Sequence, residues 1–447
     1  MALGFSSAAE VYVYVTCIFL GMSILLPLNT RYSAPMFMIN YYKYVTGDEN
    51  AEPNSKLFWA NILTFYGAIS LVIQSLVGPT VLTQAARRLS LSVRFTLSIT
   101  SMMIEVFVVL MMPVIKVSQT TAIVFFVIVT IVGGIGKCYL EATCYTLVAP
   151  LPPKFMSTIM FGICFCGVVT STIQCIIKAS MEDTYESHLT QSYIYFSLAL
   201  LFMAAALVMA LSLRYNSYAQ EMVAEYRVLK QKQEGQKVEP QPVADVPTEG
   251  KEPTCGEEGP QNKEESKGEG EVGMTTAEQL AATAVMPVVK MIHMMLLSCF
   301  LGFFVTIFIF PNLIIPIDRT HKWFATIAAL IFNIGKSIGS FSTSFKMFMY
   351  PRGVVLYGSI VRFLLIIPFM LSIYKHIPGH TVPYIFSFIL GLTHYFPVLS
   401  MVYGPTTPGL DDGQKLMAGQ LMGIALLVGV SAASVVAMIV VIFLPQD

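Results

Sequence analysis

Two lysines stand inside apolar stretches of the sequence, where a charged side chain has little reason to be tolerated. Lys336 lies within the stretch 323–348, and Lys137 lies within the stretch 123–151. A charge at the centre of a bilayer costs at least about 2.5–3.5 kcal/mol, so such residues usually face a bundle interior or a water-filled path. An ammonium group donates hydrogen bonds and accepts none. The two lysines therefore predict a polar cavity inside a membrane protein.

Three further ionisable residues, Glu105, Glu141 and His394, also fall within apolar stretches. Glu141 follows Lys137 by four residues, so on a helix the two share one face and can neutralise each other. Two interpretations stay open. In the first, Lys137 pairs with Glu141, and Glu105 pairs with a lysine of the other half, Lys336. In the second, a carboxylate exchanges protons, as carboxylates inside membranes often do.

The composition excludes most soluble and catalytic classes of protein. Hydrophobic residues make up 55% of the 447 residues and charged residues only 12%, against about 25% charged residues in soluble domains. This deficit predicts an integral membrane protein surrounded by the lipid bilayer. The net charge of zero gives no basis for a nucleic-acid partner. The sequence has no HExxH motif, nucleophile–base pattern or metal-ligand cluster, so we expect no enzyme and no cofactor.

Apolar runs divide the chain into eleven predicted membrane helices, since a span needs about 20 apolar residues. Six runs precede a long polar segment and five follow it, which predicts an all-α polytopic protein with a six-plus-five, two-bundle architecture. The runs lie near residues 11–29, 57–83, 94–115, 121–149, 155–178, 191–213, 287–315, 322–349, 354–374, 381–404 and 416–444.

The polar segment between the two groups of runs is rich in Glu, Lys, Gly, Pro and Gln. Such a composition cannot bury enough apolar surface to order itself. We therefore expect an N-terminal six-helix bundle in residues 1–220, a disordered loop in residues 221–285 and a C-terminal five-helix bundle in residues 286–447.

Basic residues gather in the loops on one side of the predicted helices, and such loops usually face the cytoplasm. This pattern predicts that the N-terminus and the long loop are cytoplasmic and the C-terminus extracellular, and we expect the plasma membrane. The basic residues are Arg87, Arg88, Arg94, Lys154, Arg214, Arg227, Lys230, Lys346 and Arg352.

Several short motifs resemble those of the equilibrative nucleoside transporter family and occur in the family's order. Residues 21–29 are similar to the family's Gly-x-x-x-Leu-Leu-Pro-Trp-Asn signature, with Leu28 in place of the tryptophan. Residues 304–311, 361–368 and 403–405 resemble motifs of the seventh, ninth and tenth helices. The first helix looks closest to that of kinetoplastid members. The resemblance implies a major-facilitator-like fold that carries purine nucleosides or nucleobases by alternating access.

The eighth predicted helix departs from the family's Phe-Asn-x-x-Asp-x-x-Gly-Arg pattern. Residues 332–340 place Lys336 at the acidic position and Ser340 at the arginine position. The family pattern implies an ion pair there that helps to position the substrate, so its loss shifts the expected substrate towards nucleobases. Lys137, by contrast, falls where the resemblance implies Gln or, in kinetoplastid members, Lys.

The resemblance and the chemistry of the side chains together define a predicted site. A purine needs a few fixed polar partners and apolar walls. Arg362 is expected to form a structural ion pair, and Tyr66 to be a further wall. The predicted substrate-binding residues are Lys137, Asn333, Lys336, Leu28, Asn29, Glu141, Ser340 and Phe332, with Phe310 and Pro311 as a gate and Glu105, Glu141 and His394 as candidates for proton coupling.

Two other functions stay open at this point. The same fold could carry an organic cation such as choline, with Glu105 or Glu141 as counter-charge and with Tyr139 and Tyr145 offering cation–π contacts. Unpaired lysines in the site would oppose that function. The other alternative is a membrane sensor that transports nothing and signals through the polar loop. Whether protons accompany the substrate is also open.

Overall fold

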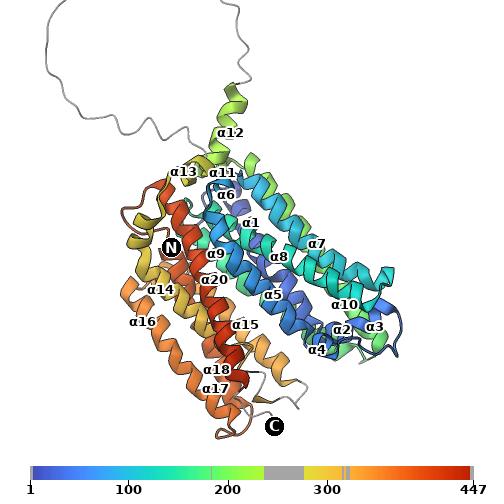
Figure 1. The fold of residues 1–447 in the computed structure, drawn as a ribbon. Coiled ribbons are helices and arrows are strands. Elements are labelled where there is room, and N and C mark those ends of the chain that lie inside the picture. Colours follow the sequence, from blue (N-terminus) through green and yellow to red (C-terminus); the bar gives the residue numbers. More distant parts are fainter. Residues whose placement is uncertain (1–3, 183, 236–275, 315–316, 319–322, 443–447) are drawn as a thin grey trace, which may run out of the picture.

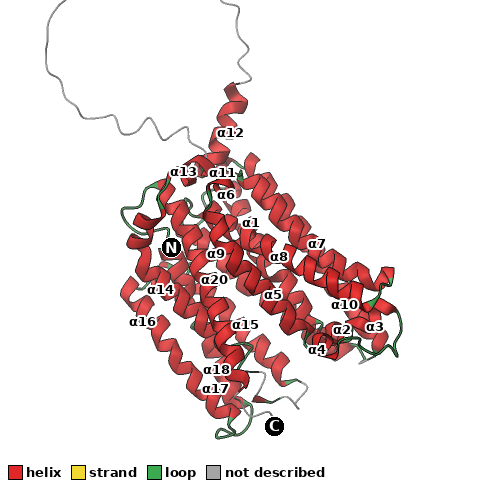
Figure 2. Cartoon of the chain, in the orientation of Figure 1, coloured by secondary structure: helices red, strands yellow, loops and turns green. Residues whose placement is uncertain are grey.

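The computed structural model describes residues 4–182, 184–235, 276–314, 317–318 and 323–442 of the chain. These residues form helices and loops and no strand (Figure 2). Eleven helical segments among them are long and apolar enough to cross a membrane, six before the polar segment and five after it. The predicted all-helical, six-plus-five architecture is therefore confirmed.

The spans follow the predicted runs in order. They occupy Ala8–Ser33 (α1), Ile62–Leu82 (α5 with η1), Leu91–Ile115 (α7), Gln119–Val148 (α8), Pro153–Ser180 (α9), Tyr185–Tyr215 (α10 with η2), Val285–Ile309 (α14), Phe324–Ser342 (α15), Arg352–Ile373 (α16, η5 and α17), Thr381–Tyr403 (α18 with α19) and Asp412–Ala437, part of α20. Within the composite spans the helices are α5 Ile62–Val77, η1 Gly78–Leu82, α10 Tyr185–Ser212, η2 Leu213–Tyr215, α16 Arg352–Val361, η5 Arg362–Leu365, α17 Ile366–Ile373, α18 Thr381–Leu392 and α19 Tyr395–Tyr403, and α20 as a whole runs Asp412–Ile442.

Short helices lie at both ends of the spans. They are α2 Pro35–Ile39, α3 Tyr41–Thr46, α4 Lys56–Ala60, α6 Gln84–Arg87, α11 Ser217–Met222, α12 Ala224–Gly235, α13 Thr276–Ala282 and η4 Lys346–Phe348. We call the end of the molecule that carries α11, α12 and α13 the loop end, and the opposite end, which carries α2, α3 and α4, the far end (Figure 1).

Hydroxyl side chains fix where several spans begin. Ser90 precedes α7 and Ser118 precedes α8, and each side-chain oxygen accepts a hydrogen bond from a backbone N–H of the first turn. Thr184 does the same for α10. Such caps satisfy donors that have no partner inside the helix. Pro153, at the first position of α9, needs no partner for its nitrogen.

The segment 221–285 contains helices at both of its ends. Helix α12 follows the sixth span, and α13 precedes the seventh. Tyr226 and Leu280 on these helices are almost fully buried, which explains why local composition alone did not reveal the helices. The predicted disorder therefore does not hold for α12 and α13, and residues 236–275 lie outside the described residues.

The two bundles are built on one plan. Within the first bundle α1 packs along α9, and within the second α14 packs along α20, so the first helix pairs with the fifth in both cases. Between the bundles, α5 packs on α20 and α15 on α9, so each second helix meets the other bundle's fifth. Matching contacts of this kind are expected of a transporter made from structural repeats. The blue-to-green and yellow-to-red halves of Figure 1 show the two bundles side by side.

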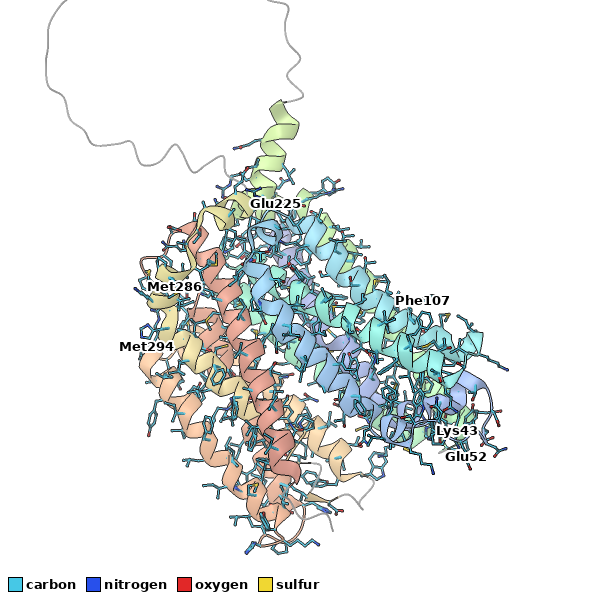
Figure 3. All side chains as sticks on the ribbon, viewed as in Figure 1. Lys43, Glu52, Phe107, Glu225, Met286 and Met294 are labelled. Carbon is cyan, nitrogen blue, oxygen red and sulfur yellow. The ribbon has the colours of Figure 1, made fainter. Side chains whose placement is uncertain are left out.

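The outer surface of the bundles is apolar between the two ends. Phe107, Met286 and Met294 point outward in Figure 3, and 51%, 64% and 41% of their surfaces are exposed. Lys43 and Glu52 lie at the far end in the same view. A large exposed apolar surface bounded by polar ends is what a lipid bilayer requires.

Candidate functional site

A buried ion pair occupies the interior of the first bundle. The Arg31 guanidinium lies 3.2 Å from Glu105, and both side chains are at most 3% exposed. Arg31 also donates to the Tyr66 hydroxyl at 3.0 Å and lies 4.3 Å from the centre of its ring. The pairing of Glu105 with Lys336, one of the interpretations left open, is not made, because Arg31 from α1 supplies the counter-charge. Tyr66, expected as a substrate wall, packs against this ion pair.

Glycine makes room for this ion pair on α8. A methyl group added to Gly133 would stand 1.8 Å from a Glu105 carboxylate oxygen, far inside contact distance. The glycine-rich turn of α8 therefore serves close packing against α7, where Glu105 resides.

Glu141 lies on α8 where the first bundle meets α20. It is buried and accepts a hydrogen bond from the Tyr145 hydroxyl at 2.8 Å. Together with Gln420 it lines a cavity of about 10 Å³ between η1, α8 and α20, room for about one water molecule. Gln420 in turn donates to the Thr146 hydroxyl at 3.1 Å, so hydrogen bonds cross the interface here.

Lys137 lies one helical turn before Glu141 and is partly exposed although it sits inside a span. It forms no ion pair or hydrogen bond with any residue that the structure describes, so the predicted pairing with Glu141 is not made.

Lys336 lies on α15, the helix of the second bundle that packs on α9. Its ammonium group lies 5.9 Å from the centre of the Phe332 ring, and it too lacks an ion pair or hydrogen bond among the described residues. The Phe332 ring is only 2% exposed, so the Lys336 side chain lies along a buried ring.

The two predicted asparagines reach α9 from opposite bundles. Asn29 of α1 donates to the Cys166 sulfur at 3.4 Å, and Asn333 of α15 donates to the Ser171 hydroxyl at 3.0 Å. A methyl group on Gly167 would stand 2.4 Å from the Asn333 side-chain oxygen, so this close approach requires glycine. Helix α9 is thus the common wall on which the two asparagines converge.

The remaining predicted contacts are apolar or fully buried. Leu28 is partly exposed and packs on the core, while Ser340, one turn beyond Lys336, is fully buried. Phe332 stacks on Phe310, with ring centres 4.3 Å apart. Phe310 and its neighbour Pro311 follow the end of α14, so this proline does not kink the helix.

Arg362 is held by carbonyl and hydroxyl groups and not by a carboxylate, which makes its predicted ion pair wrong. Its guanidinium donates to the Gly302 carbonyl at 2.6 Å, the Thr306 hydroxyl at 2.8 Å and the Thr393 hydroxyl at 3.2 Å. The Thr306 hydroxyl also lies 3.2 Å from His394 Nδ1. Arg362 begins η5, and His394 lies in the gap between α18 and α19, so Arg362 connects two breaks in the membrane helices.

The structure thus places the predicted residues in three groups. Lys137 on α8, and Lys336 and Asn333 on α15, belong to helices that pack against the other bundle. Glu105 lies inside the first bundle, and His394 lies inside the second. Sequence reasoning missed Arg31, Gln420 and Ser171, and it named Tyr145 only as a cation–π contact for the alternative cation substrate. Arg31 lies two residues after Asn29. Extending the first predicted run by one helical turn would therefore have included it.

The side chains of this arrangement offer mainly hydrogen-bond donors. Both interface lysines donate only, whereas each carboxylate nearby already accepts from another side chain. The described residues therefore present a polar, positively charged interior between two packed bundles.

Comparison with known proteins identifies the family to which this architecture belongs. A family model described as "Nucleoside transporter" matches residues 126–442. Nucleoside transporter 1.1 of Leishmania donovani is 33% identical over 452 residues, covering 95% of this chain and 92% of that protein. Adenosine transporter 1 of Crithidia fasciculata is 33% identical over 457 residues, with the same coverage.

Solved structures show the same fold. The proton:xylose symporter XylE, a major facilitator superfamily protein, aligns with a TM-score of 0.62 at 13% identity, covering 97% of this chain and 90% of that one. Its partially occluded inward-open form from E. coli gives a TM-score of 0.56 at 14% identity, covering 96% and 92% of the two chains. The chain is a membrane transporter with the major facilitator fold, and it belongs to the equilibrative nucleoside transporter family.

Proposed function

We propose that the protein carries purine nucleobases or nucleosides across a membrane by alternating access of its two bundles. The observation that carries this proposal is the pair of interior lysines, Lys137 and Lys336, which come from opposite bundles and lack partners among the described residues. Purines offer ring nitrogens and exocyclic oxygens that accept hydrogen bonds from such donors. The names of the relatives, which include nucleoside and adenosine transporters, support the same substrate class.

In this proposal the two bundles share the substrate between them. Lys137 and Asn29 contact it from the first bundle, and Lys336 and Asn333 from the second. Leu28 and Phe332 serve as apolar walls. The Glu141 charge, one turn away, orients Lys137. Ser340 limits how deeply the substrate enters the site, at the position where the family pattern has arginine. A site with a few polar groups on apolar walls suits a flat heteroaromatic ligand.

Alternating access requires contacts between the bundles to break and reform. Near the loop end, Ser157 of α9 donates to the Thr343 carbonyl at 3.3 Å, and Gln420 donates to Thr146. We propose that these bonds open when the site turns to the loop end. Phe310 and Pro311 are proposed as the gate at the other side, because the Phe310 ring covers Phe332.

Proton coupling and orientation are part of the proposal. Glu105, Glu141 and His394 are the candidates for proton exchange, of which Glu105 is tied to Arg31 and Glu141 to Tyr145. The positions of the basic loop residues support a cytoplasmic N-terminus and loop end, with an extracellular C-terminus, in the plasma membrane.

An organic cation fits the interior less well. Such a substrate needs a carboxylate free to face it, and here the two interface lysines would repel it. The geometry therefore favours neutral substrates that accept hydrogen bonds.

Uptake by purified protein in liposomes tests the proposal. Labelled hypoxanthine, adenosine and choline are supplied with and without a proton gradient. We expect purine uptake above that of empty liposomes and none of choline. Choline uptake without purine uptake would overturn the proposal, and the effect of the gradient decides the coupling.

A further inference from the structure

His394 lies in the interior of the second bundle, and its hydrogen-bond partners fix the tautomer of its imidazole. The Thr306 hydroxyl donates its proton to the Gly302 carbonyl at 2.9 Å and accepts from Arg362 at 2.8 Å. The remaining contact, with His394 Nδ1 at 3.2 Å, must then have the imidazole as donor. A neutral imidazole that donates from Nδ1 accepts at Nε2. The network therefore makes His394 Nε2 a lone-pair acceptor.

This acceptor has no partner among the described residues. His394 is 1% exposed, and its Nε2 atom is buried without a hydrogen bond. A buried polar atom without a partner is costly, and natural proteins retain few of them without a functional reason. His394 lies in the gap between α18 and α19, and such helix breaks at membrane depth commonly build binding sites in transporters.

A cationic donor lies on a helix that adjoins this acceptor. Lys336 belongs to α15, which packs along α18 and contacts α19, the two helices on either side of His394. Gly391, three residues before His394, lies so close to α15 that an added methyl group would stand 2.7 Å from the Lys336 backbone nitrogen. The second bundle therefore offers an ammonium donor and an imidazole acceptor on adjoining elements. Lys137 adds a second donor from the first bundle.

We propose that the site is selective for 6-oxopurines, whose C6 carbonyl lies between the N1–H donor and the N7 acceptor, over 6-aminopurines. The N1–H donates to His394 Nε2, and Lys336 donates to the carbonyl oxygen. Lys137 donates to N7 or shares the same oxygen. This inference rests on the proposed function and names the substrate class within it.

The positive charge of the two lysines favours oxopurines over aminopurines. The O6 and N7 atoms of an oxopurine form a continuous edge of acceptors, the edge to which Lys and Arg bind in guanine. An aminopurine places an N–H₂ donor between its N1 and N7 acceptors, and that donor would face an ammonium group. When the N–H₂ donor of the ligand faces the ammonium donor of the protein, both groups stay buried without a hydrogen-bond partner. A polar site rejects a close analogue in this way.

Competition for uptake tests this selectivity. Full-length protein in liposomes takes up labelled hypoxanthine while unlabelled hypoxanthine, guanine or adenine competes. We expect adenine to require a concentration at least about tenfold higher than hypoxanthine for half-inhibition. Lys336→Met should bring that ratio towards one, and Lys336→Arg should retain it. Lys346→Met, which removes an exposed lysine of η4, is the matched control and should change nothing.

His394 is tested by a second pair of variants. His394→Gln keeps a side-chain acceptor and should retain part of the preference, whereas His394→Leu should lose it. Equal inhibition by adenine and hypoxanthine in the unaltered protein overturns the inference while purine transport stands. Failure to take up any purine, with the protein present in the liposomes, overturns the proposed function instead. Should Lys336→Met fail to reconstitute, the ratio in the unaltered protein decides alone.

Discussion

At the scale of single residues, Arg31 forms a buried ion pair inside the first bundle. It is fully buried, and its charge is balanced by Glu105 at 3.2 Å with Tyr66 completing the contact. Removing one partner of such a pair leaves an uncompensated charge, which costs more than the pair itself contributes.

Arg31→Met should destabilise the protein by about 3–5 kcal/mol, because Glu105 would remain buried without its counter-charge. Thermal unfolding of the detergent-solubilised protein measures this loss. The double variant Arg31→Met with Glu105→Leu should recover most of it, since no lone charge is left. Equal destabilisation by the single and double variants would contradict this account.

Single residues also show where sequence reasoning reached its limit. The positions of Lys137 and Lys336 inside apolar runs predicted an interior polar site, and both residues belong to helices that pack against the other bundle. Their partners were not predictable, because a pairing between helices depends on how helices rotate about their axes. Glu105 pairs with Arg31 and not with Lys336 for that reason. Arg362 was assigned a carboxylate partner, whereas the Gly302 carbonyl within α14 and the Leu390 carbonyl near the end of α18 hold it.

At the scale of elements, α9 organises the site. It packs along α1 in its own bundle and along α15 in the other. The absence of a side chain at Gly167 lets Asn333 reach Ser171.

Gly167→Ala should therefore weaken substrate binding. The added methyl group would stand 2.4 Å from the Asn333 side chain and displace it. We expect the KM for uptake to rise about tenfold with less change in maximal rate, if Asn333 binds substrate in the ground state. Ser171→Ala removes the same hydrogen bond without crowding and separates the two effects. An unchanged KM in both variants would show that Asn333 does not contact substrate.

The number and order of the spans were predictable because each must supply about 20 apolar residues. Their ends and breaks were not. The eighth run was predicted to reach residue 349, whereas α15 ends at Ser342. The breaks at η5 and between α18 and α19 lie within apolar sequence, so no change in composition marks them. They are stabilised by tertiary hydrogen bonds from Arg362, which a local pattern cannot show.

Helix α12 provides a pH-dependent contact at the loop end. Both oxygens of the buried Glu225 carboxylate accept from the Leu91 N–H at the start of α7, at 2.9 and 3.0 Å. Burial nevertheless raises the pKa of Glu225 above its usual range. Figure 3 shows Glu225 at the base of α12.

The docking of α12 should weaken as pH rises. A carboxyl group whose pKa is raised in the docked state stabilises docking most when it is protonated. Its contribution to the free energy of docking therefore decreases as pH rises from the ordinary Glu pKa, about 4.3, to the raised pKa. Hydrogen exchange of the Leu91 region across that range measures the effect. Glu225→Gln, which keeps an acceptor without a charge, should abolish the pH dependence. Protection that is constant with pH in the unaltered protein would refute the assignment.

At the scale of the whole molecule, α13 connects the two bundles at the loop end. It contacts α6 of the first bundle and α20 of the second. A methyl group added to Gly413 of α20 would stand 2.5 Å from the Thr283 hydroxyl, just beyond α13. Any transition that opens the loop end must either separate α13 from one of these two helices or move all of them together.

A cross-link at this contact should leave transport intact. Thr283→Cys combined with Gly413→Cys places two thiols close enough for a disulfide. Oxidation should not change uptake, because Thr283 lies just before α14 and Gly413 lies on α20, and both helices belong to the second bundle. Each single cysteine variant serves as the control. Loss of uptake on oxidation that a reductant restores would show that α13 and α20 move relative to each other during transport.

The lengths of the spans bear on the membrane that suits this protein. Helix α8 has 30 residues and α9 has 28, which correspond to about 45 and 42 Å. A hydrocarbon core is about 30 Å thick, so these helices tilt or project beyond it. Bilayer thickness then acts on the angle between the bundles: a thicker, sterol-rich membrane favours upright helices and a thinner one favours splayed helices. The lipid composition of the host membrane is thus a mechanical input to the transport cycle.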